Sequence, residues 1–205
     1  MPFTGSTFGL WNDSACTSAF SGILSLVNYT DLSDNPQDNI LYLGSPASSR
    51  TLEATSNPGV DNITLTPVNT SPIWVATTAY ALGKILTPTS PNGFVYICVS
   101  AGTSGSSEPT WPIVGLGSTV VDGTCMWALY AVHHPATEIK LALSSGGLSS
   151  ATGGAALSVG TSISSLAANA VAIYIRVTNT VTTVSNNTGN AEIGVLINSV
   201  IEVGV

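Results

Sequence analysis

Residues 74–130 read WVATTAYALGKILTPTSPNGFVYICVSAGTSGSSEPTWPIVGLGSTVVDGTCMWALY and contain three of the four tryptophans. Apolar side chains alternate with other side chains through the runs TAYALGKIL, FVYICVS and TCMWALY, which is typical of β-strands. Turn-forming residues bound these runs at 88–93, at 102–112 and at Asp122-Gly123. An Asp-Gly pair directly before an alternating run is a strong hairpin signal. The stretch therefore predicts a small β-module.

Several short motifs in this stretch resemble a known module. The sequences AGTSG at 101–105 and EPTWP at 108–112, followed by Asp122-Gly123 and Trp127, look like a small aromatic-rich module that recurs in structural proteins of tailed bacteriophages. More loosely, the spacing of tryptophan, tyrosine and glycine is similar to that of small chitin-binding and cellulose-binding β-modules.

The chain departs from that pattern at two positions. Lys84 stands where an acidic residue usually follows the glycine, and Cys125 stands where a small or β-branched residue is usual. The resemblance implies a β-fold for the module and a place in a phage virion, while the departures put a sugar-binding role in question.

Turn-like sequences flank the module on both sides. Asn69 to Pro72 precede it and His133-His134-Pro135 follow it, and each lies next to a segment with strand periodicity. Insertions are tolerated best at exposed loop tips whose ends lie close together. We therefore expect residues 71–134 to be a module inserted into a host domain made of residues 1–70 and 135–205.

The host segments predict an antiparallel β-sandwich, Ig-like or jelly-roll-like, preceded by an N-terminal arm. The chain has many short apolar segments separated by Gly-rich and Asn-rich turns, which favours an all-β fold. A weak helical pattern covers Ser14 to Asn28, and an irregular arm is the alternative there. The predicted strands are 40–44, Arg50 to Ala54, Val60 to Val68, Glu138 to Leu143, Ala155 to Val159, Val171 to Thr178 and Ile193 to Val203.

Periodicity also predicts which side chains face the core. Alternation places Ile139, Leu141 and Leu143 inward and Glu138, Lys140 and Ala142 outward. The region from PATEIKLALSSGGL to AVAIYIRVTNT is in addition similar to a family of small phage virion proteins in which the insert is absent.

The composition excludes several classes of function. Lys and Arg together number 4 and Asp and Glu 11, which gives a net charge of −7. So few cations cannot neutralise many phosphates, so we expect no nucleic-acid binding and no polybasic membrane contact. The first residues show no signal-peptide pattern and no apolar run is long enough to span a membrane, so we expect synthesis in the host cytoplasm.

The titratable residues give no pattern of a catalytic or metal site. Three cysteines without a CxxC pair argue against a disulfide framework and a zinc site. His133 and His134 are adjacent on an extended chain and would point in opposite directions, so a linker role is favoured over a metal role. Glu108 has no carboxylate partner nearby in the sequence, and Asp122 is accounted for by its turn. We expect no enzyme activity, no metal and no cofactor.

The aromatic residues divide into a predicted core and a predicted surface. Trp127 lies in an alternating strand and is expected in the module core with Trp74 beneath it. Cys98 and Cys125 lie on strands that flank a long loop and are expected to face each other, as reduced buried thiols or as a late disulfide. Trp111, between prolines, is the candidate glycan-stacking residue with Tyr80 and Tyr96 behind it; the alternative is that Trp111 closes the core.

The leading interpretation is a non-enzymatic virion protein, either a capsid decoration or cement subunit or a head–tail accessory subunit, with an outward-projecting module. The alternative is a glycan-binding adhesin piece of a tail or head fibre. The expected partners are the major capsid protein or other virion subunits, together with further copies of the chain, most simply in a trimer. Sheet edges at Ile193 to Val203 or Arg50 to Ala54 are the expected contacts between copies.

Overall fold

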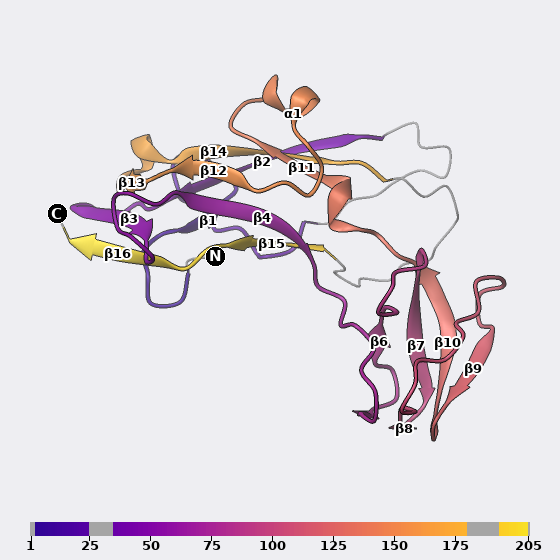
Figure 1. Cartoon of the computed structure of the whole chain (residues 1–205). Helices are drawn as coiled ribbons and strands as arrows, with labels where there is room; N and C mark the ends of the chain where they lie inside the picture. The colour runs from indigo at the N-terminus through magenta and orange to yellow at the C-terminus, as the bar shows by residue number, and fades with distance from the viewer. Residues whose placement is uncertain (1–2, 25–34, 180–192, 205) are drawn as a thin grey trace. The chain divides into compact units, whose positions relative to one another are not determined.

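The regular secondary structure of the described residues consists almost entirely of β-strands, arranged in antiparallel sheets (Figure 1). The computed structural model describes residues 3–24, 35–179 and 193–204. These residues divide into two compact units. The first unit takes its residues from Met1–Val68, Ala136–Thr180 and Gly194–Val205, and the second from Asn69–Pro135 and Val181–Ile193. The predicted insert, 71–134, lies within the second unit; that it folds without the rest of the chain stays a prediction.

One layer of the first unit is a four-stranded sheet in the order β1-β2-β14-β11. Ile173 pairs with Leu41, and both side chains are buried, as alternation predicted for Ile173. Arg176 pairs with Asp38, and the guanidinium binds the carboxylate through two contacts of 2.7 Å each. The strands are β1 (Gly9–Trp11), β2 (Gln37–Gly44), β14 (Val171–Val177) and β11 (Ile139–Ala142).

The other layer consists of two three-stranded sheets, β12-β4-β15 and β13-β3-β16. Its core includes Leu52 and Ala54 on β3, Ile63 and Leu65 on β4, and Ile163 on β13, all of which are buried. The two layers together make an antiparallel β-sandwich, as the sequence predicted. The strands are β12 (Leu157–Gly160), β4 (Ile63–Asn69), β15 (Ile193–Ile197), β13 (Ser162–Ser164), β3 (Arg50–Ala54) and β16 (Val200–Gly204).

The second unit contains a four-stranded sheet in the order β6-β7-β10-β9 and a small ladder of β5 with β8. The predicted Asp-Gly turn joins β9 to β10. Gly123 has φ +62°, and a Cβ there would lie 2.4 Å from the Thr103 carbonyl oxygen, so a glycine is required. The strands are β5 (Ala79–Tyr80), β6 (Ile85–Leu86), β7 (Phe94–Ser100), β8 (Gly102–Thr103), β9 (Thr119–Asp122) and β10 (Cys125–Val132).

Helical structure is limited to three single turns in the described residues. They are α1 (Gly147–Ser150) and the 3-10 turns Ala136–Glu138 and Ala167–Asn169. Of the two alternatives for Ser14 to Asn28, the helix is wrong as far as residue 24 and the irregular segment is correct there, because Cys16 adopts φ +54° and no helix forms. Residues 25–28 of that prediction lie outside the described residues.

Three further predictions are corrected by the structure. Glu138 and Ala142 are buried and Leu143 is 48% exposed. Glu138 belongs to a 3-10 turn, Ala142 lies against Gly147 at the start of α1, and β11 ends before Leu143. The Arg50–Ala54 strand is central, between β13 and β16, so it is not a sheet edge. The single strand expected at Ile193 to Val203 is two strands, β15 and β16, each the last in its sheet.

Candidate functional site

The sequence-predicted site residues of the second unit meet in one buried cluster. We call this the aromatic cluster. It contains Trp74, Tyr80, Leu86, Tyr96, Cys98, Cys125, Trp127 and Leu129, with Ala76, Phe94, Trp111 and Val120 packed against it. The structure thus brings all seven of the site residues named from the sequence to one face of the sheet.

Trp127 lies at the centre of the aromatic cluster and is fully buried. The Tyr80 ring lies 4.9 Å away, centroid to centroid, at 75°, and the Trp111 ring lies 6.0 Å away at 64°. Edge-to-face pairs at these distances align the positive ring edge with the negative ring face. Trp127 therefore fixes the relative orientation of the rings around it.

Asp122 binds the two buried tryptophans. It is 3% exposed, and its Oδ2 accepts hydrogen bonds from Trp74 Nε1 at 2.8 Å and Trp127 Nε1 at 2.9 Å. Its Oδ1 accepts a hydrogen bond of 2.7 Å from the Gly105 N–H. A buried carboxylate is tolerated when such donors replace its water. The sequence assigned Asp122 only to the Asp-Gly turn, and the structure shows that it also binds two buried tryptophans.

Trp111 closes the cluster on one side and keeps part of its ring accessible. It stacks on Tyr96 with a centroid distance of 4.4 Å and an angle of 37°. Its Nε1 donates to Glu108 Oε1 at 2.8 Å, and the same carboxylate accepts from the Thr89 N–H at 2.9 Å and from the Thr89 hydroxyl. Burial by itself raises the pKa of Glu108, but these hydrogen bonds outweigh it and hold the pKa below its ordinary value.

Tyr80 and Tyr96 do not offer free ring faces. Tyr80 is 9% exposed and its hydroxyl bonds to the backbone of Val75; Tyr96 is fully buried, and its hydroxyl donates to the Pro112 carbonyl. A sugar ring needs an exposed aromatic face for stacking. Tyr80 and Tyr96 thus lie behind the surface, as the sequence analysis placed them, and of the three candidate residues Trp111 is the one that is not fully covered. That Trp111 stacks on a glycan stays a prediction.

Both cysteines of the cluster are free thiols, as is Cys16. The Cys98 Sγ donates to the Ser100 carbonyl, and the Cys125 Sγ donates to the Asp122 carbonyl at 3.0 Å. Burial, with the Asp122 carboxylate nearby, raises the pKa of Cys125 to about 11. Because the thiolate is the reactive form, these thiols are poor nucleophiles and behave as core residues.

The histidine pair lies where β10 ends. The His133 backbone N–H donates to the Gly93 carbonyl at 2.9 Å, and the side chain is buried. Across residues 3–24, 35–179 and 193–204, no group of three or more His, Cys, Asp or Glu residues is placed to hold a metal ion. No helix in that part of the chain has the length and apolar character needed to cross a bilayer.

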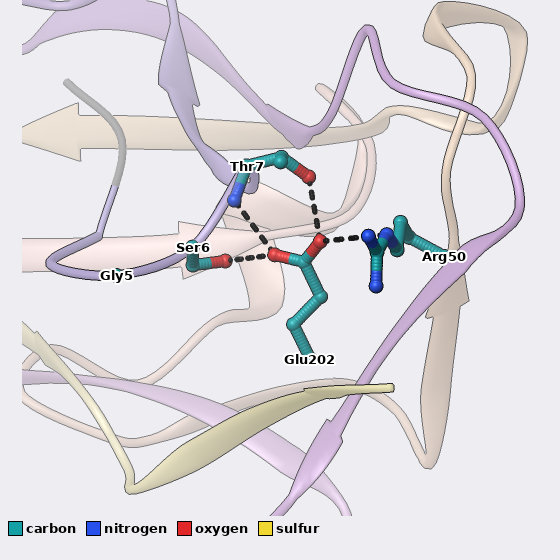
Figure 2. A pocket seen from close by; sticks show the side chains of 5 residues that line it. All are labelled: Gly5, Ser6, Thr7, Arg50 and Glu202. Atoms are coloured by element: carbon teal, nitrogen blue, oxygen red, sulfur yellow. Dashed lines mark hydrogen bonds and ion pairs between the residues drawn. The ribbon is translucent and has the colours of Figure 1, made fainter. Parts of the chain in front are cut away.

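A second polar site in the first unit had no signal in the sequence. Figure 2 shows the Glu202 carboxylate with Ser6 and Thr7 on one side and Arg50 on the other. Together with Gly5 these residues line an open hollow of about 420 Å³. Glu202 lies on β16 and Arg50 on β3, whereas Ser6 and Thr7 belong to the segment before β1.

Glu202 accepts three hydrogen bonds from the N-terminal segment. Ser6 Oγ donates at 2.7 Å and the Thr7 N–H at 2.6 Å to Oε2, and Thr7 Oγ1 donates at 2.9 Å to Oε1. The Arg50 Nε lies 3.7 Å from Oε1. Burial raises the pKa of Glu202, but the Ser6 and Thr7 hydrogen bonds and the Arg50 charge outweigh it and lower the pKa. We call this group the Glu202 clasp; its geometry joins two distant chain segments.

Comparison with known proteins adds no assignment to either site. No protein-family model matches the chain, and neither the curated proteins nor the solved structures that were searched contain a match.

Proposed function

We propose that this protein is a non-enzymatic structural subunit of a tailed-phage virion, a capsid decoration or cement subunit or a head–tail accessory subunit. The observation that carries the proposal is a surface with few charges and many exposed apolar side chains. Only 7% of the residues are charged, against about a quarter in ordinary soluble domains. Among the large apolar side chains, Val114 is 76% exposed, Val121 69% and Leu82 68%.

A surface of this kind is typical of a subunit that is covered by neighbouring subunits. Isolated soluble proteins rarely leave extended apolar areas in water, and those that exist commonly mark contacts with other proteins. A decoration subunit is surrounded by capsid protein and by further copies of itself. The partners that we propose are therefore the major capsid protein or other virion subunits, and additional copies of this chain.

The geometry of the carboxylates supports a structural role. Asp122 accepts hydrogen bonds from two indoles and a backbone N–H, Glu108 from Thr89 and Trp111, and Glu202 from Ser6 and Thr7. A general acid or base must instead reach a substrate proton. The carboxylates of all three side chains already accept hydrogen bonds from other parts of the fold.

The motif that resembles the phage module likewise makes hydrogen bonds that stabilise the fold. In AGTSG, the Gly105 N–H donates to Asp122, and in EPTWP, Glu108 accepts from the Trp111 indole. These contacts hold the aromatic cluster together, so the motif is accounted for by the stability of the module without a ligand. This favours the structural subunit over the glycan-binding adhesin, for which Trp111 is the remaining candidate residue.

Co-sedimentation with capsids that lack the protein tests the proposal. We expect the purified chain to pellet with such capsids and to raise the temperature at which they release their contents. A chain that neither binds nor stabilises capsids, but is retained on immobilised cell-surface glycan, would overturn the proposal and favour the adhesin. Trp111→Ala should abolish such retention in the second case and leave capsid binding unchanged in the first.

A further inference from the structure

The turn before β7 contains the one Asn-Gly pair of the sequence, Asn92-Gly93. An asparagine side chain has the length needed to form a five-membered ring with the backbone nitrogen of the next residue. A side chain on that next residue obstructs the approach, and glycine has none. Ring closure is therefore less hindered at Asn92 than at any other asparagine of this chain.

Gly93 leaves its backbone nitrogen accessible. The residue is exposed and has φ +88°, and a Cβ added to it would meet nothing beyond its chain neighbours within 4 Å. Its carbonyl accepts a hydrogen bond of 2.9 Å from the His133 N–H, but across residues 3–24, 35–179 and 193–204 its own N–H donates to no group. The attacking atom is thus open to the water that removes its proton.

The side-chain amide of Asn92 is held in place and polarised. The Phe94 N–H donates to Asn92 Oδ1 at 3.2 Å, and Asn92 Nδ2 donates to the Tyr96 hydroxyl at 2.8 Å. A donor on the carbonyl oxygen stabilises the negative charge that this oxygen gains when a nucleophile attacks the carbon. The two hydrogen bonds therefore keep the amide beside its own turn and favour attack on its carbon.

We propose that Asn92 is a spontaneous modification site, at which the folded chain is deamidated to aspartate and isoaspartate. The Gly93 nitrogen gives its proton to hydroxide and bonds to Asn92 Cγ. The bond between Cγ and Nδ2 breaks, and Nδ2 takes a proton from water and leaves as ammonia. Water then opens the succinimide ring at one of its two carbonyl carbons and restores the Gly93 N–H. Overall one water is consumed and one ammonia is released, without oxidation or reduction.

The product places a carboxylate beside a hydroxyl that is already in use. The Tyr96 hydroxyl accepts from Asn92 Nδ2 and donates to the Pro112 carbonyl at 2.8 Å. A carboxylate has no hydrogen to donate, so the single hydroxyl proton must serve either the carboxylate or Pro112. Hydrogen bonds to a charged acceptor are the stronger ones, so the Pro112 carbonyl loses its donor. The loop of Trp111, whose ring stacks on Tyr96, is thereby released at one contact.

Incubation of the folded full chain at neutral and at mildly alkaline pH, followed by peptide mass mapping, tests the inference. Asn198 is the matched control in the same chain. Its Oδ1 accepts from the Thr64 N–H at 2.9 Å and its Nδ2 donates to the Asn62 carbonyl at 3.0 Å, but a serine follows it. We expect a carboxyl group and isoaspartate at Asn92 while Asn198 stays intact. The rate at Asn92 should rise about tenfold per pH unit, as the deprotonated fraction of the Gly93 nitrogen does.

Two variants separate the ring chemistry from its consequence. Asn92→Gln keeps the amide but would have to close a larger ring, so it should stay unmodified in the same incubation. Asn92→Asp supplies one product directly. Trp111 is the one tryptophan that is not buried, so this variant should show stronger quenching of tryptophan fluorescence by acrylamide, as the modified native chain should. Circular dichroism establishes that each sample is folded.

Three results would contradict this account. Asn92 that stays intact in the folded chain but is converted in urea would overturn the inference, because the Phe94 and Tyr96 hydrogen bonds would then protect the amide. Equal conversion of Asn92 and Asn198 would overturn the special role of the Asn-Gly turn. A folded Asn92→Asp chain that is quenched like the native chain would overturn the release of the Trp111 loop.

Discussion

Glu202→Gln tests the Glu202 clasp with the smallest possible change of shape. The native carboxylate accepts hydrogen bonds from Ser6 Oγ, the Thr7 N–H and Thr7 Oγ1. The glutamine has one acceptor oxygen and an NH₂ group that must face donors. We therefore expect the segment around Ser6 and Thr7 to detach from β16 more readily.

The expected magnitude follows from the geometry. Hydrogen bonds to a charged group contribute about 1.5–3 kcal/mol each, against about 0.5–1.5 kcal/mol for neutral ones, so three bonds could lose several kcal/mol. Thr7 and the Arg50 side chain are exposed, so water and salt screen part of the interaction. We expect a loss of about 1–2 kcal/mol in the free energy of unfolding.

Urea unfolding at several pH values is the assay. The pKa of Glu202 is lowered in the folded chain, so its stabilisation is fully present above the ordinary value of 4.5 and is lost as the pH falls towards the folded pKa. The difference between the native chain and Glu202→Gln should therefore be largest near neutral pH and shrink below about 4.5. A difference that is absent at about pH 7, or that grows on acidification, would refute this account of the clasp.

The remaining predictions concern the second unit. Trp127→Ala should destabilise it by about 3–5 kcal/mol, because the ring is fully buried, and Trp111→Ala by about 1–3 kcal/mol, because its ring is only partly covered; equal losses in thermal unfolding would contradict this ranking. Asp122→Asn turns one acceptor oxygen into an NH₂ group that faces donors, and should cost about 2–4 kcal/mol with a red-shifted tryptophan emission; an unshifted spectrum and stability would argue against the double indole contact. Deleting residues 72–134 should leave a folded all-β protein, and the absence of a cooperative urea transition would exclude independent folding of the host.

Local patterns were sufficient to predict most strands. Ile173 and Ile175 are buried on β14 as alternation required, because a strand position is set by its neighbours two residues away. The Asp122-Gly123 hairpin was equally local, since the turn needs a positive φ that glycine supplies. Leu143 was misplaced because alternation does not say where β11 ends.

Two of the polar contacts could not be predicted because their partners lie far apart in the sequence. Asp122 bonds to Trp74 48 positions away, and Glu202 bonds to Thr7 195 positions away. No spacing rule relates such residues, since tertiary packing decides which donors surround a carboxylate. The sequence placed Tyr80 and Tyr96 behind Trp111 but did not predict that their hydroxyls donate to the carbonyls of Val75 and Pro112.

The order of strands along the chain has a consequence for synthesis. Strands β5 to β10 of the second unit come from one continuous segment, whereas Leu52 on β3 pairs with Ile163 and Glu202, which are translated much later. As the chain leaves the ribosome, the sheet of the second unit is complete while β3 and β4 still lack their partner strands. Contacts between distant segments also close more slowly than local ones. The prediction that the second unit folds on its own therefore implies that it folds before its host, with the apolar host strands exposed until their partner strands have been translated.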